Sequence, residues 1–171
     1  MKKKLLSILL TAAMATTVVS GTALIVNADS EGDLSGKTFA IVIRNSGNPY
    51  AEKEADGFKQ VIEAAGGECI IKSPEKATAD AQIPLIQSLI SQEVDAIAIA
   101  SNDVNALTAC LQDAMDEGIK VLSLDSNVVP EARQTFVNQA GVTEIGQALA
   151  DAVYDISGGS GEFAILSASS Q

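Results

Sequence analysis

Short runs of apolar residues recur along the chain from Lys37 onward and predict the strands of a buried sheet. Each run is nearly continuous rather than alternating with polar residues, which is typical of parallel strands covered on both faces. The predicted strands are residues 39–43, 69–71, 96–100, 121–124, 135–137 and 163–166.

Segments with apolar residues at helical spacing separate most of these runs. The first predicted helix, residues 49–65, has Asn48 in position to cap it and Pro49 in its first turn. The second predicted helix, residues 79–91, contains Pro84. Because proline cannot donate the backbone hydrogen bond of a helix interior, we expect this helix to begin late or to bend at Pro84.

Two further helices are predicted in the second half of the chain. One covers residues 104–117, with Asp103 as its cap, and the other covers residues 142–156. Apolar residues of the last helix repeat on one face, and we expect five of them to point inward: Val142, Ile145, Leu149, Val153 and Ile156.

Strand and helix alternate at a spacing that predicts an α/β fold, a doubly wound parallel sheet with helices on both faces. The last predicted strand, residues 163–166, has no helix after it, although a parallel strand normally needs one to cover its face of the sheet. We therefore interpret the chain as a fragment, with one complete lobe and the beginning of a second.

The N-terminus has the pattern of a secretory signal peptide. Lys2, Lys3 and Lys4 precede an uncharged run over residues 5–26, and Val26-Asn27-Ala28 supplies the small residues of a cleavage site. An uncleaved anchor is the alternative, since about 20 apolar residues can span a bilayer. Thr22 occupies the place of the lipidated cysteine in a lipoprotein signal, so we predict a periplasmic or extracellular protein that is soluble after cleavage.

Charge and cysteine content narrow the function further. The chain has 11 basic and 22 acidic residues and no histidine, and a negative field of this kind repels nucleic acid and anionic membranes. The two cysteines, Cys69 and Cys110, fall in a predicted strand and a predicted helix. A disulfide is one alternative in an oxidising compartment, but two buried free thiols are favoured.

Polar side chains follow several of the predicted strands, where open parallel sheets bind their ligands. Arg44 and Asn45 follow the first strand, Asp125 the fourth and Asn138 the fifth, while Asn48 and Tyr50 begin the first helix. Carboxylate, amide and guanidinium groups satisfy the hydroxyls of a sugar, and an aromatic face packs on its ring. The six predicted ligand-binding residues are Arg44, Asn45, Asn48, Tyr50, Asp125 and Asn138.

The same segments resemble the periplasmic-binding-protein-like (type I) sugar receptors, in particular the ribose, rhamnose and autoinducer-2 group. Asn48-Pro49-Tyr50 is similar to the Asn-Pro-aromatic motif that opens the first helix of ribose receptors. Residues 119–127 and 133–139 resemble the V-x-T-W-D-S-D and R-x-x-x-V/I-N-Q stretches of rhamnose and autoinducer-2 receptors. Two positions depart from these motifs: Leu124 replaces a tryptophan, and Ala51 replaces a second aromatic residue.

The resemblance implies a two-lobed solute-binding protein that closes on one sugar and delivers it to a membrane-embedded ABC permease. In this interpretation residues 1–28 are the signal peptide, 29–138 the N-terminal sugar-binding lobe and 139–171 the start of the C-terminal lobe. We expect no cofactor and no metal, and a monomer when the protein is complete. A receptor that presents sugar to a sensor kinase or chemoreceptor is the alternative.

Other classes fit the sequence less well. It has no histidine for general-base catalysis and no nucleophile-elbow, dinucleotide or phosphate-loop motif, so we predict that it is not an enzyme. A repressor's sensing domain would share the fold, but it would carry a basic DNA-binding segment in place of the signal peptide.

Overall fold

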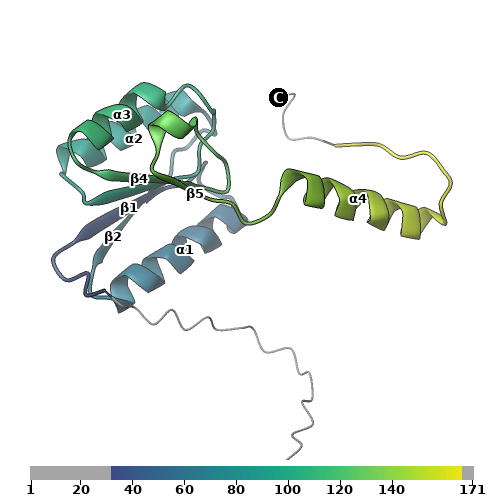
Figure 1. Cartoon of the computed structure of the whole chain (residues 1–171), viewed down its shortest axis with the longest axis horizontal. Helices are drawn as coiled ribbons and strands as arrows, with labels where there is room; N and C mark the ends of the chain where they lie inside the picture. Colours follow the sequence, from purple (N-terminus) through teal and green to yellow (C-terminus); the bar gives the residue numbers. More distant parts are fainter. Residues whose placement is uncertain (1–31, 167–171) are drawn as a thin grey trace, which may run out of the picture. The chain divides into compact units, whose positions relative to one another are not determined.

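The computed structural model describes residues 32–166, so the predicted signal peptide over 1–28 and residues 167–171 lie outside it. Its centre is a sheet of five parallel strands in the order β2-β1-β3-β4-β5. The predicted α/β fold with a parallel sheet is confirmed (Figure 1). The strands are β1 (Thr38–Val42), β2 (Glu68–Lys72), β3 (Ala96–Ile99), β4 (Lys120–Leu124) and β5 (Thr135–Val137).

Helices connect each strand to the next from β1 to β5, as parallel pairing requires, and α4 follows the last strand. Asn48 caps the first helix, where its side-chain oxygen accepts hydrogen bonds from the backbone N–H groups of Tyr50 (3.1 Å) and Ala51 (3.4 Å). The second helix is capped by Thr78 and runs without interruption through Pro84, so it does not begin late. The helices are α1 (Pro49–Ala64), α2 (Ala79–Ser91), α3 (Thr108–Asp116) and α4 (Val142–Ser157), with a short 3-10 helix, η1, at Pro130–Ala132.

The sheet carries a separate apolar cluster on each face. On one face, α1 packs through Ala51 and Ala55 against Ile41 and Ile43 of the first strand segment. On the other face, α2 and α3 pack against the sheet with fully buried residues such as Ile86, Leu89, Ile97, Ile99 and Leu111. Burial of both faces explains why these strands are apolar throughout rather than alternating.

Successive strands are added on opposite sides of β1. The chain moves from β1 outward to β2, and then crosses back to place β3 on the other side of β1. At such a switch point the connections after the two central strands diverge, which leaves a crevice at their carboxyl ends. The loops that begin at Arg44 and Ser101 leave the sheet at this point.

Two predicted elements differ in the structure. Residues 163–166 are irregular and exposed and do not form a sixth strand, because no neighbouring strand within residues 32–166 offers them backbone hydrogen bonds. The third helix begins at Thr108 rather than at residue 104. Asp103 caps a turn instead, since its carboxylate accepts hydrogen bonds from the N–H groups of Asn105 and Ala106, both at 2.8 Å.

The inward face predicted for the last helix is also wrong for the described part of the chain. None of the residues of α4 is buried, and Val142 and Ile156 are 87% and 88% exposed. The apolar repeat is present, but no element within residues 32–166 covers it.

The two cysteines do not form a disulfide. Cys110 is buried and free, as predicted, whereas Cys69 is free but only half-buried because it lies on the edge strand β2. Partial burial raises the pKa of the Cys69 thiol, and the nearby Glu63 carboxylate adds to this effect.

Candidate functional site

The carboxyl ends of β1 and β3 carry a pair of polar residues that bridge the switch point. Arg44 is half-buried, and its Nε donates a hydrogen bond to the side-chain oxygen of Asn102 at 3.2 Å. The side-chain amide of Asn102 donates in return to the backbone carbonyl of Arg44 at 2.7 Å. Because both bonds join the same two residues, they hold the Arg44 side chain against the loop after β3.

Asp125 lies at the tip of the tight turn that follows β4. Its φ of 58° is in the left-handed region, which is uncommon for residues other than glycine and least costly for Asp and Asn. The turn is closed by a bridge between Leu124 and Ser126, and the Ser126 hydroxyl donates to the carbonyl of Ser101 at 2.7 Å. Backbone strain of this kind collects at functional positions, where the surrounding structure enforces it.

Three side chains from distant parts of the chain meet at the same edge of the sheet. The side-chain amide nitrogen of Gln139, after β5, donates to the Tyr50 hydroxyl at 2.7 Å and to the Asp125 carboxylate at 3.0 Å. Tyr50 itself is 54% exposed at the start of α1. An exposed aromatic residue, a carboxylate and a carboxamide are thereby brought together, and we call Tyr50, Asp125 and Gln139 the rim cluster.

The remaining predicted site residues have mainly local contacts. Asn45 donates to the carbonyl of its neighbour Ser46 at 2.8 Å, and Asn48 uses its side-chain oxygen to cap α1. Asn138 is exposed beside the rim cluster, but the contacts with Tyr50 and Asp125 belong to Gln139. Gln139 comes directly after Asn138 at the end of β5, and this position behind a strand was the sequence signal that could have identified it.

A second carboxylate, Glu54 of α1, lies close enough to Asp125 to feel its charge. Partial burial raises the pKa of Glu54, and the charge of Asp125 raises it further. One of its oxygens, Oε2, is shielded from solvent and has no hydrogen-bond partner within the described residues. The acidic side of the rim cluster is therefore more extensive than the predicted residues indicated.

The two positions that depart from the aromatic motifs of sugar receptors are buried. Ala51 is 3% and Leu124 is 8% exposed, and both belong to the apolar cluster under α1. Neither position therefore adds an aromatic side chain to this edge of the sheet, where Tyr50 is exposed.

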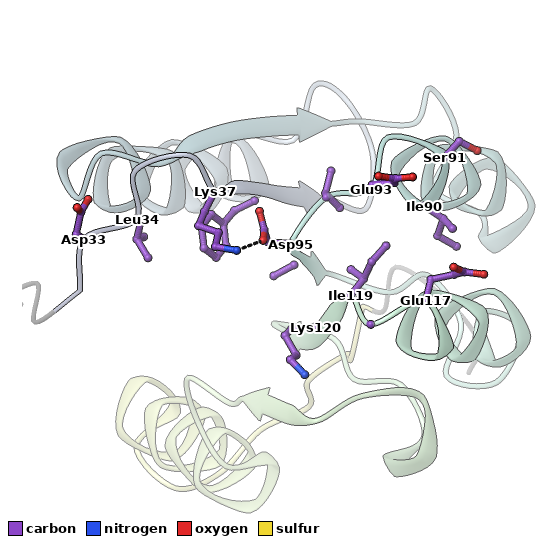
Figure 2. A pocket seen from close by; sticks show the side chains of 14 residues that line it. Asp33, Leu34, Lys37, Ile90, Ser91, Glu93, Asp95, Glu117, Ile119 and Lys120 are labelled. Atoms are coloured by element: carbon purple, nitrogen blue, oxygen red, sulfur yellow. Dashed lines mark hydrogen bonds and ion pairs between the residues drawn. The ribbon is translucent and has the colours of Figure 1, made fainter.

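A hollow lies at the opposite edge of the sheet. It has a volume of about 880 Å³ and surrounds the starts of β1, β3 and β4 (Figure 2). Lys37 and Asp95 form an ion pair there at 2.7 Å, and the hydrogen bonds from Lys37 and the Thr38 N–H lower the pKa of Asp95. None of the six predicted ligand-binding residues lines this hollow.

Residues 32–166 have neither a metal-site arrangement nor a membrane-spanning helix. Within this range no group of three or more Cys, Asp or Glu residues is arranged to hold a metal ion. No helix in the same range combines the length and apolarity that crossing a bilayer requires.

Comparison with known proteins decides the family. Residues 39–171 match the family model described as "Periplasmic binding protein domain". The chain belongs to the periplasmic binding protein family. The predicted resemblance to periplasmic-binding-protein-like receptors is thereby confirmed, and this family consists of solute-binding proteins rather than enzymes.

Three relatives illustrate the similarity. A crystal structure of an ABC transporter solute-binding protein from Clostridium phytofermentas with bound L-rhamnose is 57% identical, covers 73% of this chain and 39% of that chain, and superimposes with a TM-score of 0.71. LsrB from Clostridium saccharobutylicum in complex with AI-2 is 28% identical, covering 69% of this chain and 36% of that chain, with a TM-score of 0.65. The D-ribose/D-allose-binding protein of Pseudomonas aeruginosa is 28% identical over 121 residues, which are 66% of this chain and 35% of the relative.

The chain therefore spans between about one third and two fifths of the length of these relatives. The described residues therefore correspond to a part of each of them.

Proposed function

We propose that this chain supplies the first lobe of an exported solute-binding protein that captures a sugar and delivers it to an ABC permease. The observation that carries the proposal is the rim cluster, in which Tyr50, Asp125 and Gln139 converge at the carboxyl edge of the sheet. Arg44 and Asn102 occupy the neighbouring switch point. The family assignment and the relatives described with bound sugars or with AI-2 support the same function.

Each residue has a role that its chemistry fits. The Asp125 carboxylate accepts hydrogen bonds from ligand hydroxyls, and Arg44 donates to ligand oxygens, both as charge-assisted contacts. The exposed ring of Tyr50 packs on the apolar face of the sugar. Gln139 connects Tyr50 to Asp125 and so fixes the separation between the aromatic contact and the carboxylate contact. Asn45, Asn48 and Asn138 line the edge of the same site.

The proposed mechanism is closure of two lobes on the ligand. Residues 29–138 form the first lobe, and residues 139–171 begin the second. A ligand that contacts both lobes stabilises the closed form through its higher affinity for that form. The closed monomer then docks on the permease outside the cytoplasm. A signal peptide over residues 1–28 accounts for the export.

The first ligand to test is L-rhamnose, because the relative with bound L-rhamnose is 57% identical to this chain. D-Ribose and AI-2 are the next candidates, since the other two relatives are named for ribose or bound to AI-2. Related receptors have aromatic residues at the positions of Ala51 and Leu124. Their absence here favours a ligand whose ring packs against one aromatic side chain, Tyr50.

Isothermal titration calorimetry of the full-length protein tests the proposal. We expect micromolar or tighter binding of one of the three ligands. Replacing Asp125 by Asn preserves the left-handed backbone but removes the charge, and should weaken this binding at least tenfold, about 1.4 kcal/mol. Asp113→Asn, the same substitution at an exposed position of α3, is the control and should bind like wild type.

Two results would contradict the proposed function. One is the absence of heat for all three ligands with folded wild-type protein. The other is equal affinity of the Asp125→Asn and Asp113→Asn variants, which would remove the rim cluster from the binding site.

A further inference from the structure

One polar side chain lies in the middle of the apolar stripe of α2. The buried residues of this helix are Ala79, Gln82, Ile86 and Leu89, which follow the spacing of a helix face that packs on a core. Gln82 has 0% of its surface exposed. A buried carboxamide is costly unless all of its hydrogen-bonding groups are satisfied, so its partners indicate what it is for.

Gln82 is satisfied entirely by the backbone at the ends of the two central strands. Its side-chain nitrogen donates to the carbonyl of Ile43 at 3.2 Å and to the carbonyl of Ala100 at 2.8 Å. Its side-chain oxygen accepts from the N–H of Asn102 at 2.9 Å. The first carbonyl follows β1 and the other two groups follow β3, so one side chain ties together both loops at the switch point.

The chemistry of these partners fixes the residue type. Two carbonyls require a donor that can serve both, and one N–H requires an acceptor, which a carboxamide supplies from a single group. Glutamate would place a carboxylate against two carbonyl oxygens. Methionine fills a similar volume but can neither donate nor accept these bonds strongly.

The hydrogen-bonded path continues from Gln82 to the candidate site in two directions. Asn102, whose N–H is held by Gln82, exchanges two hydrogen bonds with Arg44. Next to Asn102, the Ser101 carbonyl accepts from the hydroxyl of Ser126, the residue that follows Asp125. The same buried side chain is thus connected to the cation and to the carboxylate of the site.

We propose that Gln82 is a positioning residue, which holds the loops after β1 and β3 so that Arg44 and Asp125 face one ligand. This inference rests on the proposed function, because it assigns Gln82 a role in the same binding site. Gln82 does not touch the ligand. It acts by keeping the backbone of Asn102 in the place from which Arg44 is oriented.

The test is a binding measurement on the full-length protein with Gln82→Met, and with Gln87→Met as a matched control. Gln87 lies on the exposed side of the same helix, so the same substitution there leaves the two loops intact. Each protein is titrated with L-rhamnose, D-ribose and AI-2 at a temperature where urea unfolding shows it to be fully folded. We expect Gln82→Met to weaken the binding of the wild-type ligand at least tenfold and Gln87→Met to leave it within twofold.

A double-mutant cycle separates positioning from a general loss of stability. If Gln82 acts through Arg44, the affinity loss caused by Gln82→Met becomes much smaller in an Arg44→Met background. A merely structural role would lower the unfolding midpoint and leave the affinity of the folded protein unchanged. Should Gln82→Met fail to fold, Asn102→Ala cuts the same path in the half-buried loop and must produce the same loss of affinity.

The outcomes distinguish this inference from the function on which it rests. Wild-type protein that binds none of the three ligands overturns both. Wild-type protein that binds, together with unchanged affinity in folded Gln82→Met or in Asn102→Ala, overturns the role of Gln82 and leaves the proposed function standing.

Discussion

At the scale of single residues, two carboxylate residues at the candidate site are in arrangements that cost free energy. Asp125 has a left-handed backbone, and Glu54 keeps one carboxylate oxygen away from solvent without a hydrogen-bond partner among the described residues. Each arrangement lowers the stability of the fold, and such costs are typical of residues that are kept for function. Ligand binding at the carboxyl edge of the sheet is a function that fits both residues.

Glu54 gives a prediction about pH. Its pKa is raised by burial and by Asp125, so the folded state favours the protonated form. The contribution of Glu54 to the free energy of unfolding is therefore fully present below the pKa of glutamate in an unfolded chain, about 4.3. It is lost as the pH rises through the raised pKa of the folded state. Glu54→Gln should stabilise the protein against urea at pH 7, and this gain should shrink toward zero at pH 4.

The control for this measurement is Asp56→Asn, which removes a carboxylate from an exposed position of the same helix. It should not show the same dependence on pH. A Glu54→Gln variant that is no more stable than wild type at pH 7 would contradict the account of Glu54.

At the scale of elements, the sequence predicted the structure correctly where residues within one segment determine its conformation. Continuous apolar runs predicted all five strands, and the apolar spacing with Asn48 and Pro49 predicted α1. Predictions were wrong where the conformation of a segment depends on contacts with other residues. Residues 163–166 are as apolar as a strand but have no neighbour to pair with in the described chain. The start of α3 shifted because Asp103 closes a separate turn first.

The candidate site could be predicted only in outline for the same reason. Arg44, Tyr50 and Asp125 follow strand ends or begin a helix, and such positions are visible in the sequence. Gln82 was not recognised because its value lies in three backbone partners that only the folded chain brings together. In the sequence it was one glutamine within an apolar helix face.

The capping of α1 by Asn48 is a prediction at this scale. Asn48→Ala removes the acceptor for the N–H groups of Tyr50 and Ala51 and should lower the free energy of unfolding by about 1 kcal/mol. Asn48→Ser keeps an acceptor and should cost less. Urea unfolding of both variants, with Asn45→Ala for comparison, checks this, and equal stability of Asn48→Ala and Asn45→Ala would count against the cap.

At the scale of the whole molecule, one proposal explains two observations, the exposed apolar face of α4 and the partial coverage of the relatives. The chain covers 39% of the relative with bound L-rhamnose, and the apolar residues Val142, Leu149 and Ile156 of α4 are exposed. We propose that α4 belongs to the second lobe, and that the rest of that lobe packs on this face and supplies the other side of the cleft. The prediction that these residues face inward then applies to the complete protein.

The chain also offers two different places for a small molecule, at opposite edges of one sheet. The carboxyl edge carries the rim cluster and Arg44, whereas the amino edge carries the hollow with the Lys37–Asp95 ion pair. The proposed function places the sugar at the carboxyl edge and not in the hollow at the amino edge.

A crystal structure of the full-length protein with its tightest-binding sugar tests this placement most directly. We expect density for the sugar ring against Tyr50, with ligand hydroxyls in hydrogen-bond contact with Asp125 and Arg44. Sugar density beside Lys37 and Asp95, with the rim cluster empty, would contradict it.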